Sequence, residues 1–225
     1  MVKTENDRQF AFLKPTAILI DGAFFLKRYR CCFDKNHSPD IVAKNMYTMC
    51  MKHVQNERLY RILYYDCLPL DIKMKNPINS KEIDFSKTQT AIFRQKFLKE
   101  LKKLRKVAIR LGFVRHHGGW IITPKKTKEL LSGKIKINDL SETDIIINAK
   151  QKGVDIKIGL DIASLAYKKL VDKIILISGD SDFVPAAKLA RREGIDFVLD
   201  PMWQQINDAL FEHIDGLNST CKNPN

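Results

Sequence analysis

Aspartates follow two short apolar runs that lie far apart in the chain. Asp21 comes directly after AILI, and Asp180 and Asp182 come after IILISG. Both runs have the length and composition of buried parallel strands. In an open α/β sheet the ligand site lies outside the carboxyl ends of the strands, so we expect these carboxylates at one edge of the sheet. Like charges gathered there repel each other and require a neutralising partner.

Two more aspartates lie in the segment KGVDIKIGLDIASLA, near the start of a predicted helix. Asp155 and Asp161 are six residues apart. If the helix begins as early as Asp155, this spacing places them on different faces and at most one points to the sheet edge; if it begins nearer Asp161, both can. Asp66 also ends an apolar run, RILYY, but Cys-Leu-Pro follows it and its role is left open.

Four or five carboxylates at one edge favour a hard divalent cation, Mg²⁺ or Mn²⁺. Such an ion lowers the pKa of a bound water and clamps phosphate oxygens, and two ions about 3.5–4 Å apart stabilise both the attacking and the leaving oxygen. The chain carries 39 Lys and Arg against 26 Asp and Glu, a net charge of +13 that attracts polyanions. Solubility alone also explains such a charge. An acidic site in a basic protein fits hydrolysis of a phosphodiester polyanion, which is nuclease chemistry.

Each aspartate also has an ordinary structural explanation when it is taken singly. Asp182 could cap the helix that follows it, Asp21 could close an Asx-turn, and Asp155 could cap another helix. Asp161 could be a solvated charge on a helix face. Asp180 is harder to explain in this way, because it follows a strand and a glycine and has no helix turn of its own to cap. The joint placement of all these residues favours a shared site.

Apolar runs alternate with helical patterns along the chain, which predicts a doubly wound α/β sheet. The predicted strands span residues 17–20, 61–65, 174–177 and 195–199, and the predicted helices span 24–29, 41–54, 86–111, 161–170, 184–192 and 203–213. Two further β-like pieces, 113–116 and 120–123, are predicted to form a hairpin across Gly118-Gly119. The Lys-rich stretch 124–138 is predicted to be a mobile, solvated insertion.

These elements predict one α/β domain at residues 17–215, with the hairpin and the insertion at about 113–140. Residues 1–16 are a predicted N-terminal extension and 216–225 a flexible tail. No apolar run approaches the roughly 18 residues that span a bilayer, and MVKTENDRQF is too polar for a secretory signal. The five cysteines include no C-x-x-C pair, which indicates free thiols, mostly in the core. We therefore expect a soluble, cytoplasmic protein that binds no membrane.

Three segments of the chain resemble a known family. ILIDGAFFLKRY, KGVDIKIGLDIASLA and IILISGDSDFVPAAKLARREGIDFVL are similar, in this order, to motifs of the NYN domain, a branch of the PIN-like nuclease superfamily that includes the LabA-like bacterial proteins. The resemblance covers residues 17–199, and its last motif is the most specific. It implies a three-layer α/β/α PIN-like sandwich with a central, mainly parallel sheet. It also implies metal-dependent endonucleolytic cleavage of RNA, with single-stranded RNA as the expected substrate.

The same resemblance assigns roles to individual residues. It implies that Asp21, Asp155, Asp161 and Asp180 bind Mg²⁺ or Mn²⁺ and that Asp182 lies beside them as a further catalytic residue. In one respect the chain departs from the family pattern. Many NYN domains carry D-x-x-N after the first strand, whereas this chain has Phe24 at the fourth position, so a polar contact near the metal or the substrate is lost.

Basic and aromatic residues near these motifs are the expected RNA contacts. They are Lys27, Arg28, Arg115, Lys152 and Trp120. The resemblance places Lys152 near the path of the phosphates. Trp120 could stack on a base, because aromatic side chains suit single strands, or it could be a core residue. Self-association into a homo-oligomer is also compatible with the sequence.

Two other functions remain as alternatives. The first is a regulator that keeps the nuclease fold and binds RNA or a protein partner without cleavage; metal binding with no turnover would decide for it. The second is a phosphatase of the haloacid dehalogenase type. Those enzymes need D-x-D after the first strand, and here Ala23 occupies the place of the second aspartate.

Overall fold

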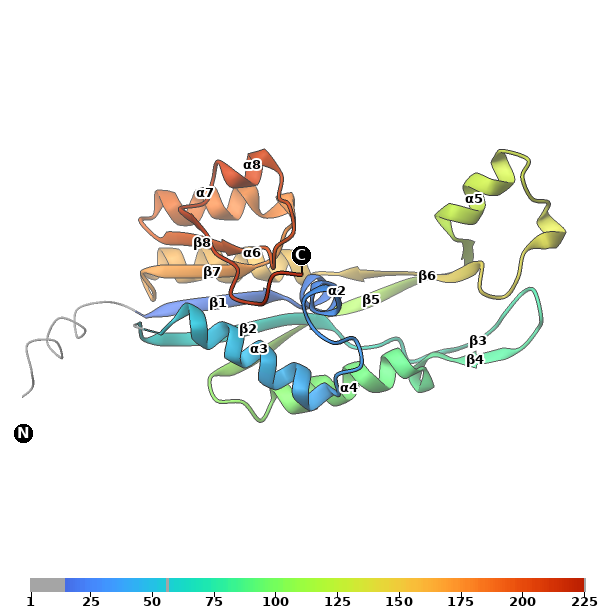
Figure 1. Cartoon of the computed structure of the whole chain (residues 1–225), viewed down its shortest axis with the longest axis horizontal. Helices are drawn as coiled ribbons and strands as arrows, with labels where there is room; N and C mark the ends of the chain where they lie inside the picture. Colours follow the sequence, from blue (N-terminus) through green and yellow to red (C-terminus); the bar gives the residue numbers. More distant parts are fainter. Residues whose placement is uncertain (1–14, 56, 225) are drawn as a thin grey trace, which may run out of the picture.

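A seven-stranded sheet runs through the centre of the protein in the order β6-β5-β2-β1-β7-β8-β9 (Figure 1). The computed structural model describes residues 15–55 and 57–224, so most of the predicted N-terminal extension lies outside the described residues. Helices cover both faces of the sheet (Figure 1). This three-layer arrangement confirms the predicted fold class.

Strand β1 (Thr16–Asp21) lies in the middle of the sheet. It pairs in parallel with β2 (Leu59–Cys67) on one side and β7 (Lys173–Ile177) on the other. Beyond β7 come the parallel strands β8 (Asp196–Asp200) and β9 (Gly216–Leu217). Beyond β2 come β5 (Val107–Ile122), which is parallel to β2, and β6 (Ile145–Lys152), which is antiparallel to β5. The apolar runs in β1, β2, β7 and β8 were thus predicted correctly as parallel strands.

Two helical layers bury alternate residues of β1. One layer contains α2 (Gly22–Cys32), α3 (Pro39–His53) and α4 (Gln89–Leu101), and the other contains α6 (Val154–Tyr167) and α7 (Val184–Arg192). Ile18 and Ile20 pack in the first layer's core, and Leu19 packs in the second. Because successive side chains of a strand point to opposite faces, Asp21 at the end of β1 is directed to the layer of α6.

Strand β5 differs from the prediction. The predicted helix 86–111 ends at Leu101 as α4, and residues 107–111 begin β5. Lys106 has a φ of 62°, a left-handed conformation that no helix can pass through. The predicted hairpin at 113–123 is wrong as well, because both pieces belong to β5 and pair with β6, which the sequence analysis did not assign. Gly118 and Gly119 lie in an irregularity of this pairing between His116 and Trp120.

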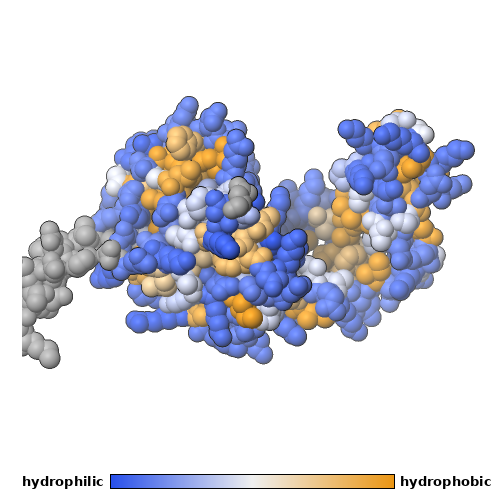
Figure 2. All heavy atoms as spheres, viewed as in Figure 1, coloured by the Kyte–Doolittle hydropathy of each residue, from blue (hydrophilic) through white to orange (hydrophobic). Residues whose placement is uncertain are grey.

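The long strand β5 carries an arm away from the body of the protein. We define the arm as residues 113–151, which include helix α5 (Pro124–Leu131) within the predicted insertion and a 3-10 turn at Ile137–Asp139. Figure 1 shows the arm extending past α2, and Figure 2 shows a hollow between the arm and the body. The hairpin of β3 (Lys73–Lys75) and β4 (Glu82–Asp84) lies beside it (Figure 1).

The C-terminal segment contains a shorter helix than predicted and contacts the body of the protein. The predicted helix 203–213 is reduced to α8 (Asp208–Phe211), because Met202 and Trp203 have φ values of 47° and 63°. Trp203 Nε1 donates to the Cys221 carbonyl oxygen at 2.9 Å, and Thr220 Oγ1 donates to the Met49 carbonyl oxygen at 3.1 Å. Residues 216–221 thus contact the body of the protein through β9 and these hydrogen bonds, and the flexibility of the tail stays a prediction.

Other features of the core agree with the sequence. The cysteines are free thiols; four are buried and Cys31 is exposed. Within the described ranges, no helix has both the length and the apolar character needed to cross a membrane.

The junction between β1 and α2 leaves no room for a side chain at Gly22. A Cβ added there would lie 2.5 Å from both the Tyr65 carbonyl oxygen and the Tyr64 hydroxyl. We expect Gly22→Ala to lower the free energy of unfolding by about 1–3 kcal/mol, because the backbone contact cannot relax easily. Urea denaturation measures this change.

Gly159 in α6 is the matched control, because a Cβ added there meets no atom within 4 Å. Gly159→Ala should raise the free energy of unfolding by about 0.5–1 kcal/mol, since alanine is the better helix former. Equal stability of the two variants would contradict the close approach at Gly22.

Candidate active site

Asp21 links the end of β1 to the start of α2. Its Oδ1 accepts hydrogen bonds from the backbone N–H groups of Ala23 at 3.0 Å and Phe24 at 3.2 Å, so it is the N-cap of α2. The pKa of Asp21 is raised to about 6, mainly by burial and to a smaller extent by the Asp155 and Asp180 carboxylates, against the two backbone hydrogen bonds, which lower it. The residue therefore caps a helix and also belongs to a group of carboxylates.

Asp155 lies in the first turn of α6. The helix begins at Val154, directly after Gly153, whose φ of 79° turns the chain from β6 into α6. Partial desolvation raises the pKa of Asp155, and the Asp180 and Asp182 carboxylates raise it further. Asp21, Asp155, Asp180 and Asp182 thus influence one another electrostatically, and we call these four residues the acidic group.

Asp180 and Asp182 follow strand β7 across Ser178 and Gly179. Asp180 is the N-cap of a 3-10 turn at Ser181–Phe183, and its Oδ1 accepts a hydrogen bond from the Asp182 N–H at 3.0 Å. The expectation that Asp180 caps nothing was therefore wrong. Both residues are exposed at the carboxyl edge of the sheet.

Phe24 fills the position where the family pattern has an asparagine. A Cβ added to Gly179 would lie 2.8 Å from the Phe24 ring, so the ring rests directly on the loop that carries Asp180. The ring therefore makes an apolar contact at the edge of the acidic group and supplies no polar side-chain atom there.

Asp161 has a different environment from the acidic group. Because α6 begins at Val154, the six-residue spacing places Asp155 and Asp161 on different faces of the helix. Asp161 Oδ2 accepts a hydrogen bond from the Tyr65 hydroxyl at 2.7 Å and pairs with Arg110 Nε at 3.3 Å. Its charge is already matched by a cation. We therefore leave Asp161 out of the metal ligands proposed below, and its metal binding stays a prediction.

Asp66 is a buried structural residue. Its carboxylate forms an ion pair with Arg94 of α4 and accepts a hydrogen bond from the Cys67 N–H at 2.7 Å. These contacts fix the end of β2 to α4, which explains why an aspartate follows this strand too.

The acidic group fits a divalent cation chemically but is not gathered into a finished metal site. In the described part of the chain, no three His, Cys, Asp or Glu side chains form a group ready to hold a metal ion. The oxygen ligands are of the kind that Mg²⁺ and Mn²⁺ prefer. Burial is the main cause of the raised pKa of Asp21, and the neighbouring Asp155 and Asp180 carboxylates add to it. A bound cation would neutralise these carboxylates.

The predicted RNA contacts fall into different environments. Lys27, Lys152 and Arg115 are exposed, and Lys152 lies at the end of β6, three residues before Asp155. Arg28 instead donates from Nε and Nη2 to the Met202 carbonyl oxygen at 3.1 and 2.7 Å, so its guanidinium stabilises the fold, and its contact with RNA stays a prediction.

Trp120 anchors the β3–β4 hairpin to the arm. Its Nε1 donates to the Lys75 carbonyl oxygen at 3.0 Å, and its ring lies 5.9 Å from that of Phe85, centroid to centroid. These contacts explain the tryptophan structurally, and stacking on a base stays a prediction.

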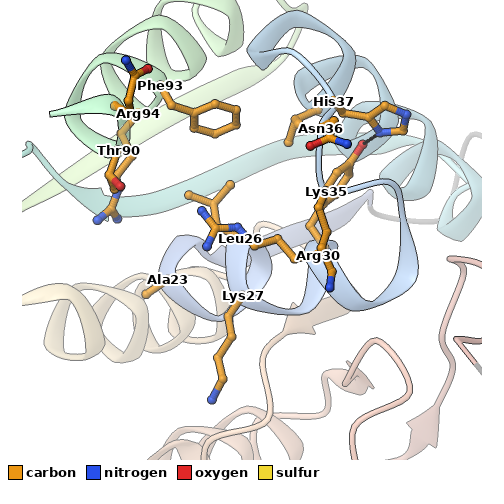
Figure 3. Close-up of a pocket in the computed structure, with 13 residues that line it drawn as sticks. Ala23, Leu26, Lys27, Arg30, Lys35, Asn36, His37, Thr90, Phe93 and Arg94 are labelled. Atoms are coloured by element: carbon orange, nitrogen blue, oxygen red, sulfur yellow. Dashed lines mark hydrogen bonds between the residues drawn. The ribbon is translucent and has the colours of Figure 1, made fainter. Parts of the chain in front are cut away.

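A basic cavity between α2 and α4 was missed in the sequence. It has a volume of about 710 Å³, and Lys27, Arg30, Lys35 and Arg94 are among its lining residues (Figure 3). The signal was available on α2, because Ala23, Lys27 and Arg30 follow the i, i+4, i+7 spacing of one helix face.

Comparison with known proteins identifies the family. The family model of the NYN domain matches residues 71–215, well over half of the chain. The chain belongs to the NYN domain family. The NYN domain is a PIN-like nuclease domain, so the family supports a nuclease in general. The NYN match includes Asp155, Asp180 and Asp182 and begins after Asp21.

A solved structure shares the overall fold of this chain. It is the crystal structure of a protein of unknown function from Vibrio parahaemolyticus, with a TM-score of 0.50 and 15% sequence identity. The alignment covers 97% of this chain and 96% of that chain. At this identity the likeness shows the fold alone. No curated protein matches the chain significantly.

The pKa of Asp21 predicts an effect on stability without metal. The folded carboxyl binds its proton more tightly than the unfolded one, so ionisation above pH 6 destabilises the fold and the penalty fades as the pH falls toward 4. We expect Asp21→Asn, measured in EDTA at pH 7, to raise the free energy of unfolding by up to about 3 kcal/mol, because the amide keeps the capping oxygen. The gain should shrink at pH 5.

Asp161→Asn is the control for this experiment, because it removes a carboxylate that is paired with Arg110 and Tyr65. It should not stabilise the protein. A loss of stability in Asp21→Asn at pH 7 would show that the carboxylate of Asp21 is not destabilised by its neighbours.

Proposed function

We propose that the protein is a divalent-metal-dependent endoribonuclease that hydrolyses phosphodiester bonds of single-stranded RNA. One observation carries the proposal: Asp21, Asp155 and Asp180 come from three segments of the chain, and their charges interact at the carboxyl edge of the sheet. Such an edge is where ligands bind in α/β sheets. Membership of a nuclease-domain family supports the same chemistry.

The acidic group would hold the cation, and neighbouring residues would orient the substrate. Asp21, Asp155 and Asp180 are the proposed ligands of Mg²⁺ or Mn²⁺. When bound, such an ion neutralises phosphate charge and lowers the pKa of the attacking water. The exposed carboxylate of Asp182 would accept a proton from that water, and the exposed ammonium group of Lys152 would bind a phosphate oxygen.

RNA must approach this site against the charge of the carboxylates. The overall charge of +13 supplies long-range attraction for a polyanion. The basic cavity between α2 and α4 begins at Ala23, whose N–H is bonded to Asp21. A strand held there would therefore enter beside the acidic group.

The decisive test is cleavage of end-labelled single-stranded RNA in Mg²⁺, in Mn²⁺ and in EDTA. Wild type should cleave only with metal. Asp180→Asn should lower the cleavage rate by about a hundredfold or more. Loss of a residue that only hydrogen-bonds to a metal ligand already lowers activity or metal affinity about 10–100-fold, and Asp180 is a proposed ligand itself. Asp196→Asn is the matched control, since Asp196 pairs with Lys173 at the opposite edge of the sheet and should leave the rate unchanged. Full activity of folded Asp180→Asn would refute the assignment.

Asp161→Asn belongs in the same assay, because it separates the two possible ligand sets. We expect most of the activity to remain, since the carboxylate is engaged by Arg110 and Tyr65. A loss equal to that of Asp180→Asn would mean that Asp161 leaves Arg110 and binds the metal.

Two observations favour a second function, RNA binding without cleavage. The carboxylates of the described residues are not gathered into a finished metal site, and Phe24 stands where the family pattern has an asparagine. RNA retention in a gel shift, together with no cleavage in either metal, would establish this function. The phosphatase alternative has no support, because the family model is that of the NYN domain.

A further inference from the structure

The cavity between α2 and α4 has the size and position of a ligand site. Its volume of about 710 Å³ lies within the range of roughly 300–1,000 Å³ that is typical of pockets for small molecules. Figure 3 shows Arg94 and Phe93 on one side and Arg30 and Lys35 on the other. A bare phosphate ion would leave most of this space empty.

The charge of the cavity is entirely positive. Lys27, Arg30, Lys35 and Arg94 line it, and its lining contains no Asp or Glu. Arg94 is held by Asp66, and its Nε is buried without a hydrogen-bond partner among the described residues. A buried donor without an acceptor is costly. An anionic ligand would compensate the positive charge of the lining residues.

An aromatic stack ends at the cavity. The Phe25 and Phe97 rings lie 6.4 Å apart at an interplanar angle of 11°, and the Phe97 and Phe93 rings lie 6.2 Å apart at 18°. Phe25 and Phe97 are buried, whereas Phe93 is half-buried and lines the cavity (Figure 3). A nucleobase could extend this stack by one ring, because every base presents a flat π-face.

The cavity adjoins the acidic group through α2. Ala23 lines the cavity, and its N–H donates to Asp21 Oδ1 at 3.0 Å. An RNA strand that leaves the cavity at Ala23 would therefore reach the acidic group beside the first turn of α2.

We propose that this cavity binds one nucleotide of the RNA strand next to the scissile phosphate. Lys27 and Arg30 bind its phosphate, and Phe93 stacks on its base. The position beside the scissile phosphate rests on the proposed nuclease function, but nucleotide binding itself can be measured without cleavage.

The test measures the affinity of a short fluorescein-labelled oligouridylate by fluorescence anisotropy in EDTA, over a series of salt concentrations. Arg30→Ala should weaken binding and lower the slope of log affinity against log salt by about one, because one phosphate contact is lost. Lys99→Ala is the matched control, since Lys99 is an exposed residue of α4 that does not line the cavity. It should change neither quantity.

Two substitutions of Phe93 test the stacking. Phe93→Leu keeps an apolar contact with Phe97 but removes the ring face, and it should weaken binding about 5- to 150-fold. Phe93→Tyr keeps the ring and should bind like wild type. If Phe93→Leu and Arg30→Ala both bind like Lys99→Ala, the cavity is not a nucleotide site, whether or not the protein cleaves RNA.

The outcome for the cavity is distinguishable from that for the nuclease. Affinity that depends on Arg30 and Phe93, in a wild-type protein that cleaves nothing with metal, would confirm the nucleotide site and refute the proposed nuclease. Metal-dependent cleavage, together with unchanged affinity in the Arg30 and Phe93 variants, would confirm the nuclease and refute the nucleotide site.

Discussion

The burial of strand β1 between β2 and β7 is the constraint on which the rest of the structure depends. Parallel pairing on both sides aligns the carboxyl ends of the three strands at one edge, and alternate residues of β1 fill the cores of two helical layers. The polar residue that ends β1 must then lie at that edge, on the side of α6. The partial burial of Asp21 follows from this position, and so does its raised pKa.

Helix α2 connects two surfaces of opposite charge. Its N-terminus is capped by Asp21 of the acidic group, and the next two turns carry Lys27 and Arg30 into the cavity. Gly22 permits this arrangement, because any side chain there would collide with the Tyr65 carbonyl oxygen. A polyanion attracted by the basic cavity is thus brought to carboxylates that would repel it without a cation. A bound cation would remove the repulsion between the carboxylates and the polyanion, so binding of the metal and binding of the substrate would favour each other.

The sequence allowed most of the sheet to be predicted, because apolar runs of four or five residues signal buried parallel strands directly. Strands β5 and β6 were not predicted. Strand β5 is long and half-exposed, and it follows Lys106, whose backbone is left-handed. Its two apolar pieces flank Gly118-Gly119, a pattern that is also typical of a hairpin. The mutual electrostatic influence of Asp21, Asp155 and Asp180 agrees with their expected approach at one edge of the sheet, whereas their function stays a prediction. The ion pair between Asp161 and Arg110 was not foreseen, because Arg110 comes from a distant strand and spacing along the chain cannot reveal such a pair.

Retention of the acidic group is difficult to explain by stability alone. Asp21 and Asp180 both cap helical turns, and an asparagine would cap equally well without the cost of burying a charge, which, with the repulsion from its neighbours, raises the pKa of Asp21. Asp66 shows how the same fold handles a buried carboxylate that serves structure, since Arg94 neutralises it. The acidic group has no comparable arginine among its described contacts. A cluster that lowers stability and leaves its charge uncompensated is the arrangement expected of a site that acquires its cation from solution.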